Sequence, residues 1–528
     1  MMWLIITISV LCAIIYYKVA RSLNYWNERG VVHKKAWYII QNLVQLVFQK
    51  FSFYDSVRNL YQEFSNERYF GSYQFLRPAL FINDPDLIKK ITVKDYEYFI
   101  DHCGVILEDV GSLQGRNLFN LKGQEWRDMR ATISPLFTSS KMKMMFTLIN
   151  ESAEEFTDYF DNQQNTFFEV EIKDVFSRFT NDVIANVAFG LKCNSLKEKC
   201  NEFYMMGKKT SFSGIRFFIF ILYTGFPRIA KLLKLKFLPT SATEFFKCAI
   251  KDSVNKREKD GIIRPDMIHL LVETKRGVVV KEDSYAPDSS FAATTESEIF
   301  YSGKKPKIEL TEEDITAQAI IFILGGLETT STLMSLIAYE LAMNEDVQKK
   351  LQDEIKETLH ECNGKLTYEA VQKMMYMDMV VSETLRKWPT GFTLDRLCVK
   401  DYLIEPVHSW EKPLLIEKGT MIQIPVGGIH HDPKYFPDPE KFDPERFNDD
   451  SKHNIKHFTY FPFGSGPRNC IASRFALIKN KILIFHLLSK FDIVKTKKTP
   501  CNVKMALNSF SLYPATALWV GLKRKDGV

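Results

Sequence analysis

The sequence predicts a mainly α-helical protein with a small β-sheet region. Apolar residues recur at three- and four-residue spacing over five long stretches, residues 141–160, 174–189, 312–343, 346–359 and 368–387. Strand-like segments are short and lie at residues 72–82, 401–404, 421–426 and 517–522. No repeat and no long Gly/Ser linker divides the 528 residues, so we expect one large folded body rather than several small domains.

The composition excludes some classes of function. The net charge of +6 is small for this length and is not gathered into one basic run, which argues against nucleic-acid binding. Nine scattered cysteines without a Cys-x-x-Cys pair argue against a zinc ribbon or a thioredoxin-like pair, and favour reduced thiols in a cytosolic environment. The 41 Phe and 22 Tyr residues suit a large apolar cavity or a membrane-facing surface as well as a core.

The N-terminus has the composition of a membrane anchor. Residues 1–17 carry no charge, and a helix of this length just reaches the lower limit for crossing the hydrocarbon core. Basic residues follow this stretch and none precedes it, which places the body on the cytoplasmic face. The alternative, a cleaved signal peptide, lacks a basic start and a small-x-small cleavage site. We therefore expect an anchor and the start of a linker at residues 1–25 and one folded domain at residues 26–528.

Three further segments give expectations about the body. The apolar stretch Ile215–Phe226 is too short to span a membrane, and it is either buried core or an element that enters the bilayer interface. Residues 274–306 are polar without apolar periodicity, which predicts a flexible surface insertion. Thr311 and Asp314 then form a capping-box-like start to the long helix 312–343.

The strongest local signal is the loop Phe463-Gly-Ser-Gly-Pro-Arg-Asn-Cys-Ile-Ala472, which leads into an apolar helix. A cysteine just before a helix faces backbone N–H groups that favour a thiolate. Gly464 and Gly466 can take positive φ and wrap the backbone around the sulfur of Cys470. Arg468 offers a fixed positive charge for a carboxylate. A phosphate-binding loop would need a Gly-Lys-Ser/Thr ending, which is absent. A plain Gly-rich turn with an incidental cysteine is the remaining alternative on this segment alone.

This loop resembles the haem-binding loop of the cytochrome P450 superfamily, Phe-x-x-Gly-x-Arg-x-Cys-x-Gly, with Ala472 at the last position as the single departure. The resemblance implies a cytochrome P450 fold, with haem b (iron protoporphyrin IX) held between a long central helix and the cysteine-bearing loop. It also implies that Cys470 is the thiolate ligand of the iron, that Phe463 packs against it and that Arg468 binds a haem propionate. A thiolate ligand favours O–O cleavage.

Three other motifs resemble the same family and follow in its order. Gly325-Gly-Leu-Glu-Thr-Thr330 breaks helix preference inside the helix 312–343, for which back-bonded hydroxyls on a bent helix are the structural alternative. It is similar to the oxygen-binding helix of the family. The resemblance implies that Glu328 and Thr329 help to deliver protons to dioxygen and that Gly326 contacts the haem.

The remaining two motifs concern the supports of the cofactor. Glu383 and Arg386 lie on one helix face, and the segment 439–447 is similar to the family's meander, which implies a buried structural ion network with Arg446. Trp126, Arg130 and Arg396 match positions that contact the propionates. The likeness covers essentially the whole chain and is greatest to insect-type microsomal members, although the usual proline-rich linker after the anchor is missing.

Together these motifs imply a monooxygenase that inserts one atom of O2 into a lipophilic substrate such as a dietary toxin, a lipid or a hormone. No flavin or nicotinamide fingerprint is present, so electrons are expected from an NADPH-dependent reductase, with cytochrome b5 as a further partner, at the endoplasmic reticulum membrane. Docking residues are expected around Cys470, namely Arg127, Lys141 and Arg474. The expected substrate pocket is lined by residues 101–118, 212–220, Phe322, 389–393 and Phe510. A haem-thiolate isomerase or dehydratase and a non-enzymatic haem sensor are the alternatives.

Overall fold

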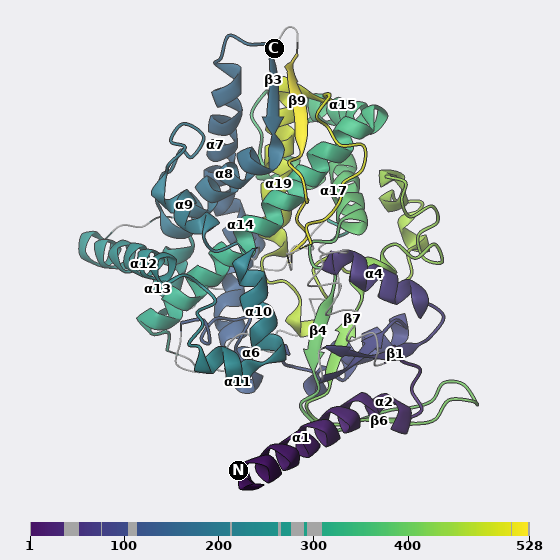
Figure 1. Ribbon diagram of the computed structural model, residues 1–528. Helices are drawn as coiled ribbons and strands as arrows, with labels where there is room; N and C mark the ends of the chain where they lie inside the picture. The colour runs from purple at the N-terminus through teal and green to yellow at the C-terminus, as the bar shows by residue number, and fades with distance from the viewer. Residues whose placement is uncertain are drawn as a thin grey trace.

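The computed structural model describes residues 2–35, 52–74, 77–103, 113–211, 214–261, 264, 266–275, 290–292, 309–507, 509 and 511–525, and every structural statement below concerns these residues. The described chain is mainly helical with small sheets, which confirms the predicted fold class (Figure 1).

The helices that build the body and its N-terminal extension are α1 Met2–Leu23, α2 Tyr25–Glu28, α4 Phe53–Glu63, α5 Pro85–Lys89, α6 Gly123–Ile133, α7 Ser139–Asp161, α8 Ile172–Ile184, α9 Glu202–Lys208, α10 Ile215–Gly225, α11 Pro227–Leu232, α12 Thr240–Asp260, α13 Met267–Lys275, α14 Glu312–Met343, α15 Glu345–Glu361, α16 Tyr368–Lys373, α17 Met375–Lys387, α18 Val426–Ile429 and α19 Ser473–Lys490. The strands are β1 Tyr69–Gln74, β2 Arg77–Ile82, β3 Phe167–Glu171, β4 Leu394–Leu397, β5 Tyr402–Ile404, β6 Leu414–Ile416, β7 Met421–Ile424, β8 Phe491–Val494 and β9 Trp519–Arg524. They pair in the orders β1-β2-β7-β4, β3-β9-β8 and β5-β6, and β2 and β7 are the parallel pair.

The long helix α14 has the predicted bounds. The Thr311 hydroxyl accepts a hydrogen bond from the Asp314 backbone N–H, and the Asp314 carboxylate accepts one from the Thr311 N–H, which confirms the predicted capping box. The expected single helix 368–387 is wrong, because the chain breaks at Met374 into α16 and α17. The Glu354 carboxylate accepts hydrogen bonds from the first backbone N–H groups of α17, and this long-range cap stabilises a new helix start.

The strand-like pieces expected at residues 72–82 are present as two strands, β1 and β2. The structure has an antiparallel hairpin in which Tyr69 pairs with Ile82 and Gln74 pairs with Arg77. Residues 75 and 76 between the strands are Phe and Leu, and neither is a turn signal, so the reversal is not visible in the sequence.

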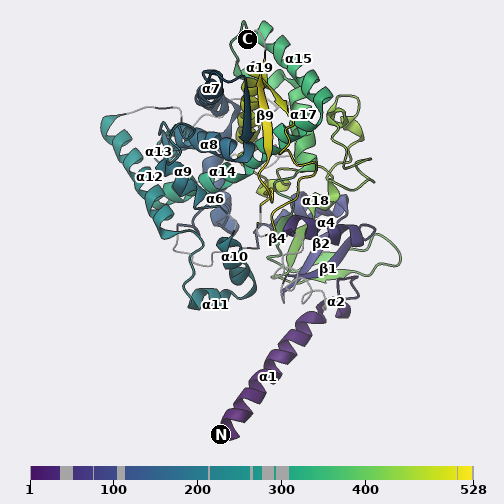
Figure 2. The same ribbon diagram turned by 45° about the horizontal axis from the view of Figure 1, so that its top comes forward.

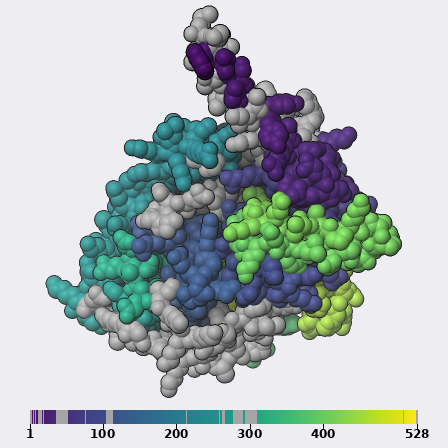
Figure 3. Space-filling view, turned by 90° about the horizontal axis from the view of Figure 1, so that it is seen from below, coloured from purple at the N-terminus to yellow at the C-terminus, as the bar shows by residue number. Residues whose placement is uncertain are grey.

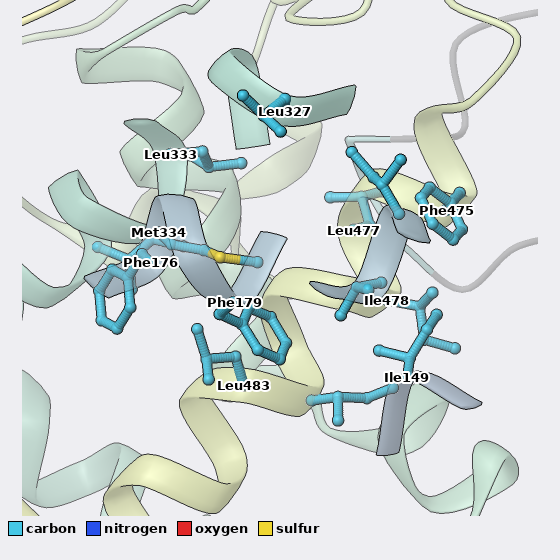
Figure 4. Packing of buried hydrophobic residues seen from close by; sticks show 14 of the residues in the cluster. Ile149, Phe176, Phe179, Leu327, Leu333, Met334, Phe475, Leu477, Ile478 and Leu483 are labelled. Carbon is cyan, nitrogen blue, oxygen red and sulfur yellow. The ribbon is translucent and has the colours of Figure 1, made fainter. Parts of the chain in front are cut away.

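The central helix α14 is buried on nearly all sides, as expected for a helix that is apolar all round. Figure 4 shows its side chains Leu333 and Met334 near Phe176 and Phe179 of α8, and Leu483 of α19 next to these two rings. Among the described residues, α14 is the one helix that is long and apolar enough to cross a membrane, and most of it lies inside the body. It is therefore a core helix, and it forms one wall of the site described below.

The N-terminal helix α1 projects away from the body in both ribbon views (Figures 1 and 2). The body begins directly after it, because Trp26 of α2 is fully buried and donates a hydrogen bond from Nε1 to the Ser72 carbonyl.

The helices α10 and α11 lie at the same end of the molecule as α1 (Figures 1 and 2), and Figure 3 shows the surface at this end. Ile215 is 72% exposed and Leu232 is 82% exposed, whereas Phe217 is buried. The segment that was expected to be either core or an interface element therefore presents one apolar face to solvent.

Most of the segment 274–306 lies outside the described residues. Of its described part, Ser290 and Ala292 are buried, and the Phe291 backbone N–H donates to Asp378 Oδ2 at 3.0 Å. These three residues pack on the body, and the Phe291 ring lies 5.3 Å from that of Phe447. The flexible insertion expected at residues 274–306 stays a prediction.

Candidate active site

A cavity of about 430 Å³ lies between α14 and the loop before α19. It is lined by eight of the residues that were expected at a haem site: Trp126, Arg130, Gly326, Thr329, Arg396, Phe463, Arg468 and Cys470. The remaining wall is largely apolar and includes Leu118, Phe137, Ile184 and Phe322. Segments far apart in the sequence thus meet around one apolar space of the size of a small-molecule site.

The loop that carries Cys470 is held in a fixed shape. Gly464 and Gly466 have φ values of 81° and 71°, which confirms their predicted positive φ. A Cβ at Gly466 would lie 1.8 Å from the Thr92 carbonyl oxygen, so only glycine fits there. The Cys470 N–H donates to the Phe463 carbonyl at 2.8 Å, which closes the loop.

The Cys470 side chain is exposed although protein atoms surround it. It is one of the residues that line the cavity. Burial raises the pKa of this thiol, while a backbone hydrogen bond from Ala472 and the charge of Arg130 act in the opposite direction. A metal cation bound to the sulfur would reverse this balance, since coordination deprotonates a thiol.

Three arginines, Arg130, Arg396 and Arg468, are among the residues that line the cavity. Arg396 is almost fully buried and donates to the Ser465 carbonyl at 3.1 Å. Arg468 donates to the carbonyls of Ile100 at 2.6 Å and Leu121 at 2.8 Å. Burial, followed by the neighbouring charge of Arg396, lowers the pKa of Arg468.

The third guanidinium group, Arg130, binds the loop before Cys470, and Trp126 contacts Arg468. Arg130 donates to the backbone oxygen of Asn469 at 2.9 Å and to its side-chain oxygen at 2.7 Å, next to Cys470. The Arg468 guanidinium lies 4.0 Å from the centre of the Trp126 ring. The like charges of these arginines disfavour one another, and an anionic group in the cavity would relieve that repulsion.

The two side chains of α14 that were expected to be catalytic, Glu328 and Thr329, lie in different surroundings. Thr329 lines the cavity, and its hydroxyl donates to the Gly325 carbonyl at 2.5 Å. Glu328 is buried outside the cavity lining, and its carboxylate accepts hydrogen bonds from the hydroxyls of Ser211 at 3.1 Å and Ser511 at 2.6 Å. The neighbouring residues Glu328 and Thr329 therefore point into different surroundings.

The ion network expected near the haem loop is assembled in the structure. Arg386 and Glu383 are both fully buried and form two hydrogen bonds of 2.7 and 2.9 Å. Arg446 lies 3.5 Å from Glu383 in an ion pair, a longer contact than that of Arg386. The Arg386 guanidinium also donates to the His430 carbonyl at 2.9 Å, which joins α17 to the segment after α18.

The expected substrate-lining segments are met in part. Leu118, Phe322, Thr390 and Gly391 line the cavity. Residues 104–112, Phe212 and Phe510 lie outside the described residues. The described residues of α10 are not among those that line the cavity.

Comparison with known proteins agrees with this geometry. Residues 33–519 match the family described as Cytochrome P450. The chain belongs to the cytochrome P450 family. It is 43% identical to Cytochrome P450 9e2 of Blattella germanica, over 98% of this chain and 97% of that one. It is 37% identical to Probable cytochrome P450 9f2 of Drosophila melanogaster over the full length of both, and 35% identical to Cytochrome P450 6k1 of Blattella germanica over 96% of this chain and 93% of that one.

As a member of this family the chain is a haem-binding monooxygenase, and its class takes electrons from a redox partner. The cavity fits a haem: one thiol faces an apolar space, and an excess of positive charge lies at one side of it. Among the described residues there is no group of three or more His, Cys, Asp or Glu side chains that could hold a metal ion.

Three residues near this site, Asn469, Lys173 and Lys479, were not identified from the sequence. Asn469 positions Arg130, and nothing in the motif marks that role. Lys173 and Lys479 are buried and bind backbone oxygens of α14 close to the cavity. A signal existed for Lys479, because Lys479, Asn480 and Lys481 interrupt an otherwise apolar helix.

Proposed function

We propose that this protein holds haem b through the Cys470 thiolate and inserts one atom of O2 into a lipophilic organic substrate, with electrons from an NADPH-dependent reductase. The observation that carries the proposal is the exposed side chain of Cys470, which lines the largely apolar cavity together with residues of α14. Cytochrome b5 is a second candidate donor. When bound, the haem supplies the activation of O2, which thiolate ligation favours.

Within this proposal the arginines bind the carboxylates of the haem. Arg130, Arg396 and Arg468 lie together at the cavity, and their mutual repulsion is offset when two propionates take places beside them. Trp126 keeps the Arg468 guanidinium in place from behind. Phe463 covers the sulfur side. Gly326 lines the cavity on the α14 side and has no side chain to narrow it, and a Cβ there would press on Ile184 at 3.2 Å.

The two polar residues of α14 have separate tasks in the proton supply. The Thr329 hydroxyl is at the cavity wall and can hold a proton within reach of bound O2. The Glu328 carboxylate receives hydrogen bonds from Ser211 and Ser511 on the other side of the helix. We propose that Glu328 takes protons from that side, and that Thr329 presents them in the dry cavity.

Replacing Thr329 with Ala should leave haem binding intact and lower the product formed per NADPH consumed by about an order of magnitude. The lost electrons should leave as hydrogen peroxide, because O2 receives them without an ordered proton donor. Product, NADPH and peroxide are measured together. Thr316→Ala, in the same helix but outside the cavity lining, is the control. If the coupling, that is the product formed per NADPH consumed, is unchanged in Thr329→Ala, Thr329 is not on the proton path.

The same assay with purified reductase and a panel of lipophilic compounds separates the alternative functions. A monooxygenase consumes NADPH in proportion to substrate oxidation. Turnover of a hydroperoxide without reductase would favour an isomerase or dehydratase, and haem binding with neither activity would favour a sensor. The apolar lining supports lipophilic compounds such as toxins, lipids or hormones, and substrate-induced spectral shifts across a broad library would narrow the class.

The reductase should dock on the Cys470 side of the body, as the electron path to the sulfur is shortest there. Arg127, Lys141 and Arg474 are partly exposed and basic, which supports their role as docking residues. Arg127 also forms an ion pair with Glu97 at 3.1 Å. Charge reversal at Lys141 should raise the reductase concentration needed for half-maximal turnover without changing the haem spectrum.

We further propose that residues 1–25 anchor the body, residues 26–528, on the cytoplasmic face of the endoplasmic reticulum membrane. The uncharged stretch 2–17 of α1, the basic residues Lys18 and Arg21 that follow it in the same helix, and the exposed apolar face of α10 and α11 at the same end support this orientation. Lys231 and Lys234 lie beside Leu232 and Leu233 and suit an anionic lipid surface.

Removal of residues 2–23 should weaken binding to vesicles of phosphatidylcholine and phosphatidylserine without abolishing it. Further replacement of Leu232 and Leu233 with Asp should weaken it by roughly 10- to 150-fold for each leucine, because each loses about 1.5–3 kcal/mol of apolar burial. Vesicle flotation measures both steps. The control is Met375→Asp on α17, where an apolar residue is also exposed. Equal losses in the control would exclude α11 as a specific membrane contact.

A further inference from the structure

Lys479 lies in the middle of α19 with no exposed surface. Its ammonium group donates to the Gly326 carbonyl oxygen of α14 at 3.1 Å. Gly326 lines the cavity, and so do Phe475 and Ala476 in the turn of α19 that precedes Lys479. The side chain therefore connects the helix that follows the Cys470 loop to the helix that carries Thr329.

This contact is made at a turn of α14 whose backbone carbonyls also accept side-chain hydrogen bonds. The Gly326 carbonyl also accepts a hydrogen bond from the Thr330 hydroxyl at 2.5 Å, so it serves two donors besides its own helix. Thr329 makes the corresponding bond to the Gly325 carbonyl one residue earlier. Extra donors to a helix carbonyl weaken the regular i to i−4 bond and bend the helix locally.

We propose that Lys479 is a positioning residue: its ammonium group draws the Gly326 carbonyl toward α19 and thereby sets the orientation of the neighbouring Thr329 hydroxyl at the cavity. This role rests on the proposed function of Thr329, and it assigns a task to a buried charge that neither ligates iron nor touches the substrate. Its consequence is that the yield of product per NADPH depends on the protonation of Lys479.

The charge of Lys479 is not balanced by a carboxylate among the described residues. Burial alone lowers its pKa to about 7. The titratable groups on the helices packed against α19 are engaged elsewhere, as Asp378 of α17 pairs with Lys481, Asp158 of α7 pairs with Lys490, and Glu328 of α14 accepts from two serine hydroxyls. His486 of α19 itself bonds Asn150.

The lowered pKa of Lys479 predicts how the coupling depends on pH. Below pH 7 the ammonium group makes a charge-assisted bond to Gly326, and above it the neutral amine makes a weaker one. Coupling in the wild type should therefore fall about fivefold as the pH rises through neutrality, since a hydrogen bond to a charged group is roughly twice as strong as a neutral one. Lys479→Met should show low coupling that does not vary with pH. Lys479→Arg stays charged and should keep high coupling across the same range.

Lys481→Met is the matched control. Lys481 is equally buried on α19, but its ammonium group pairs with Asp378 at 2.8 Å on α17, away from the cavity. This variant should lose stability while keeping the wild-type coupling and pH profile. If it loses coupling as Lys479→Met does, or if Lys479→Met keeps the wild-type profile, the positioning role is wrong.

Thermal unfolding gives a readout that is independent of turnover. The folded pKa of Lys479 lies below the value of 10.5 in the unfolded chain, so the unfolded chain binds more protons between about pH 7 and 10.5. The charged lysine therefore costs stability most at or below pH 7, and this cost shrinks as the pH rises. The difference in Tm between Lys479→Met and the wild type should be more positive at pH 6 than at pH 9. A difference independent of pH would overturn the lowered pKa. If Lys479→Met does not fold, the pH profile of coupling in Lys479→Arg decides whether the positioning role holds.

The carbon monoxide spectrum is recorded for each of these variants. An intact spectrum shows that Cys470 still holds the haem, so a failure of this proposal is distinguishable from a failure of the Cys470 assignment.

Discussion

Replacing Cys470 with His should remove the red-shifted absorption band of the reduced carbon monoxide complex and move it to the position of imidazole ligation. Cys470 is the one cysteine among the described residues that line the cavity, and its thiolate would supply the electron density that favours O–O cleavage once it binds the iron. Substrate oxidation should fall to background, because the chemistry needs that ligand and not only a bound haem. Absorption spectra and product analysis on the same preparation measure both effects.

Cys501→Ser is the matched control for this substitution. Cys501 is exposed and lies outside the cavity lining, so its removal should change neither the spectrum nor the activity. Survival of the red-shifted band in Cys470→His would show that another side chain holds the iron. In that case the proposed function would fail, even though the fold would stand.

Replacing Arg386 with Ala should lower the free energy of unfolding by about 3–5 kcal/mol, because the fully buried Glu383 carboxylate loses its two short bonds to a guanidinium and keeps the 3.5 Å contact of Arg446 and the Asp443 N–H bond of 2.9 Å. The loss is increased by the freed carbonyls of His430 and Pro439, which Arg386 also binds. Urea unfolding and the fraction of protein that takes up haem measure the effect. We expect little folded holoenzyme at growth temperature.

An exposed ion pair provides the contrast. Lys350 and Glu445 lie 2.8 Å apart with both side chains largely exposed, so Lys350→Ala should cost about 0–1 kcal/mol. Arg386→Lys should also be poorly tolerated, since an ammonium group cannot reproduce the two parallel bonds of the guanidinium to Glu383. A cost in Arg386→Ala no larger than that in Lys350→Ala would show that the network does not support the core.

The sequence predicted the fold class, the bounds of the long helix and its capping box, because each depends on local features. Apolar periodicity marks 312–343, and Thr311 and Asp314 act within one turn. The positive φ at Gly464 and Gly466 followed in the same way from residues adjacent in the chain. The break at Met374 was not predictable, since the cap for α17 comes from Glu354, more than one helix away.

The resemblance to the family identified candidate residues for the site, and the sequence motifs indicated the chemistry of each one. What the sequence by itself determined is the set of groups available: one thiol before a helix, glycines and hydroxyls inside another, and arginines spread over more than 300 positions. Only the tertiary structure decided how these groups face one another. It turns Thr329 into the cavity and Glu328 away from it, and it brings the ammonium group of Lys479 onto the Gly326 carbonyl. The reason is physical: side-chain direction and burial depend on packing between distant segments, and no local pattern contains that information.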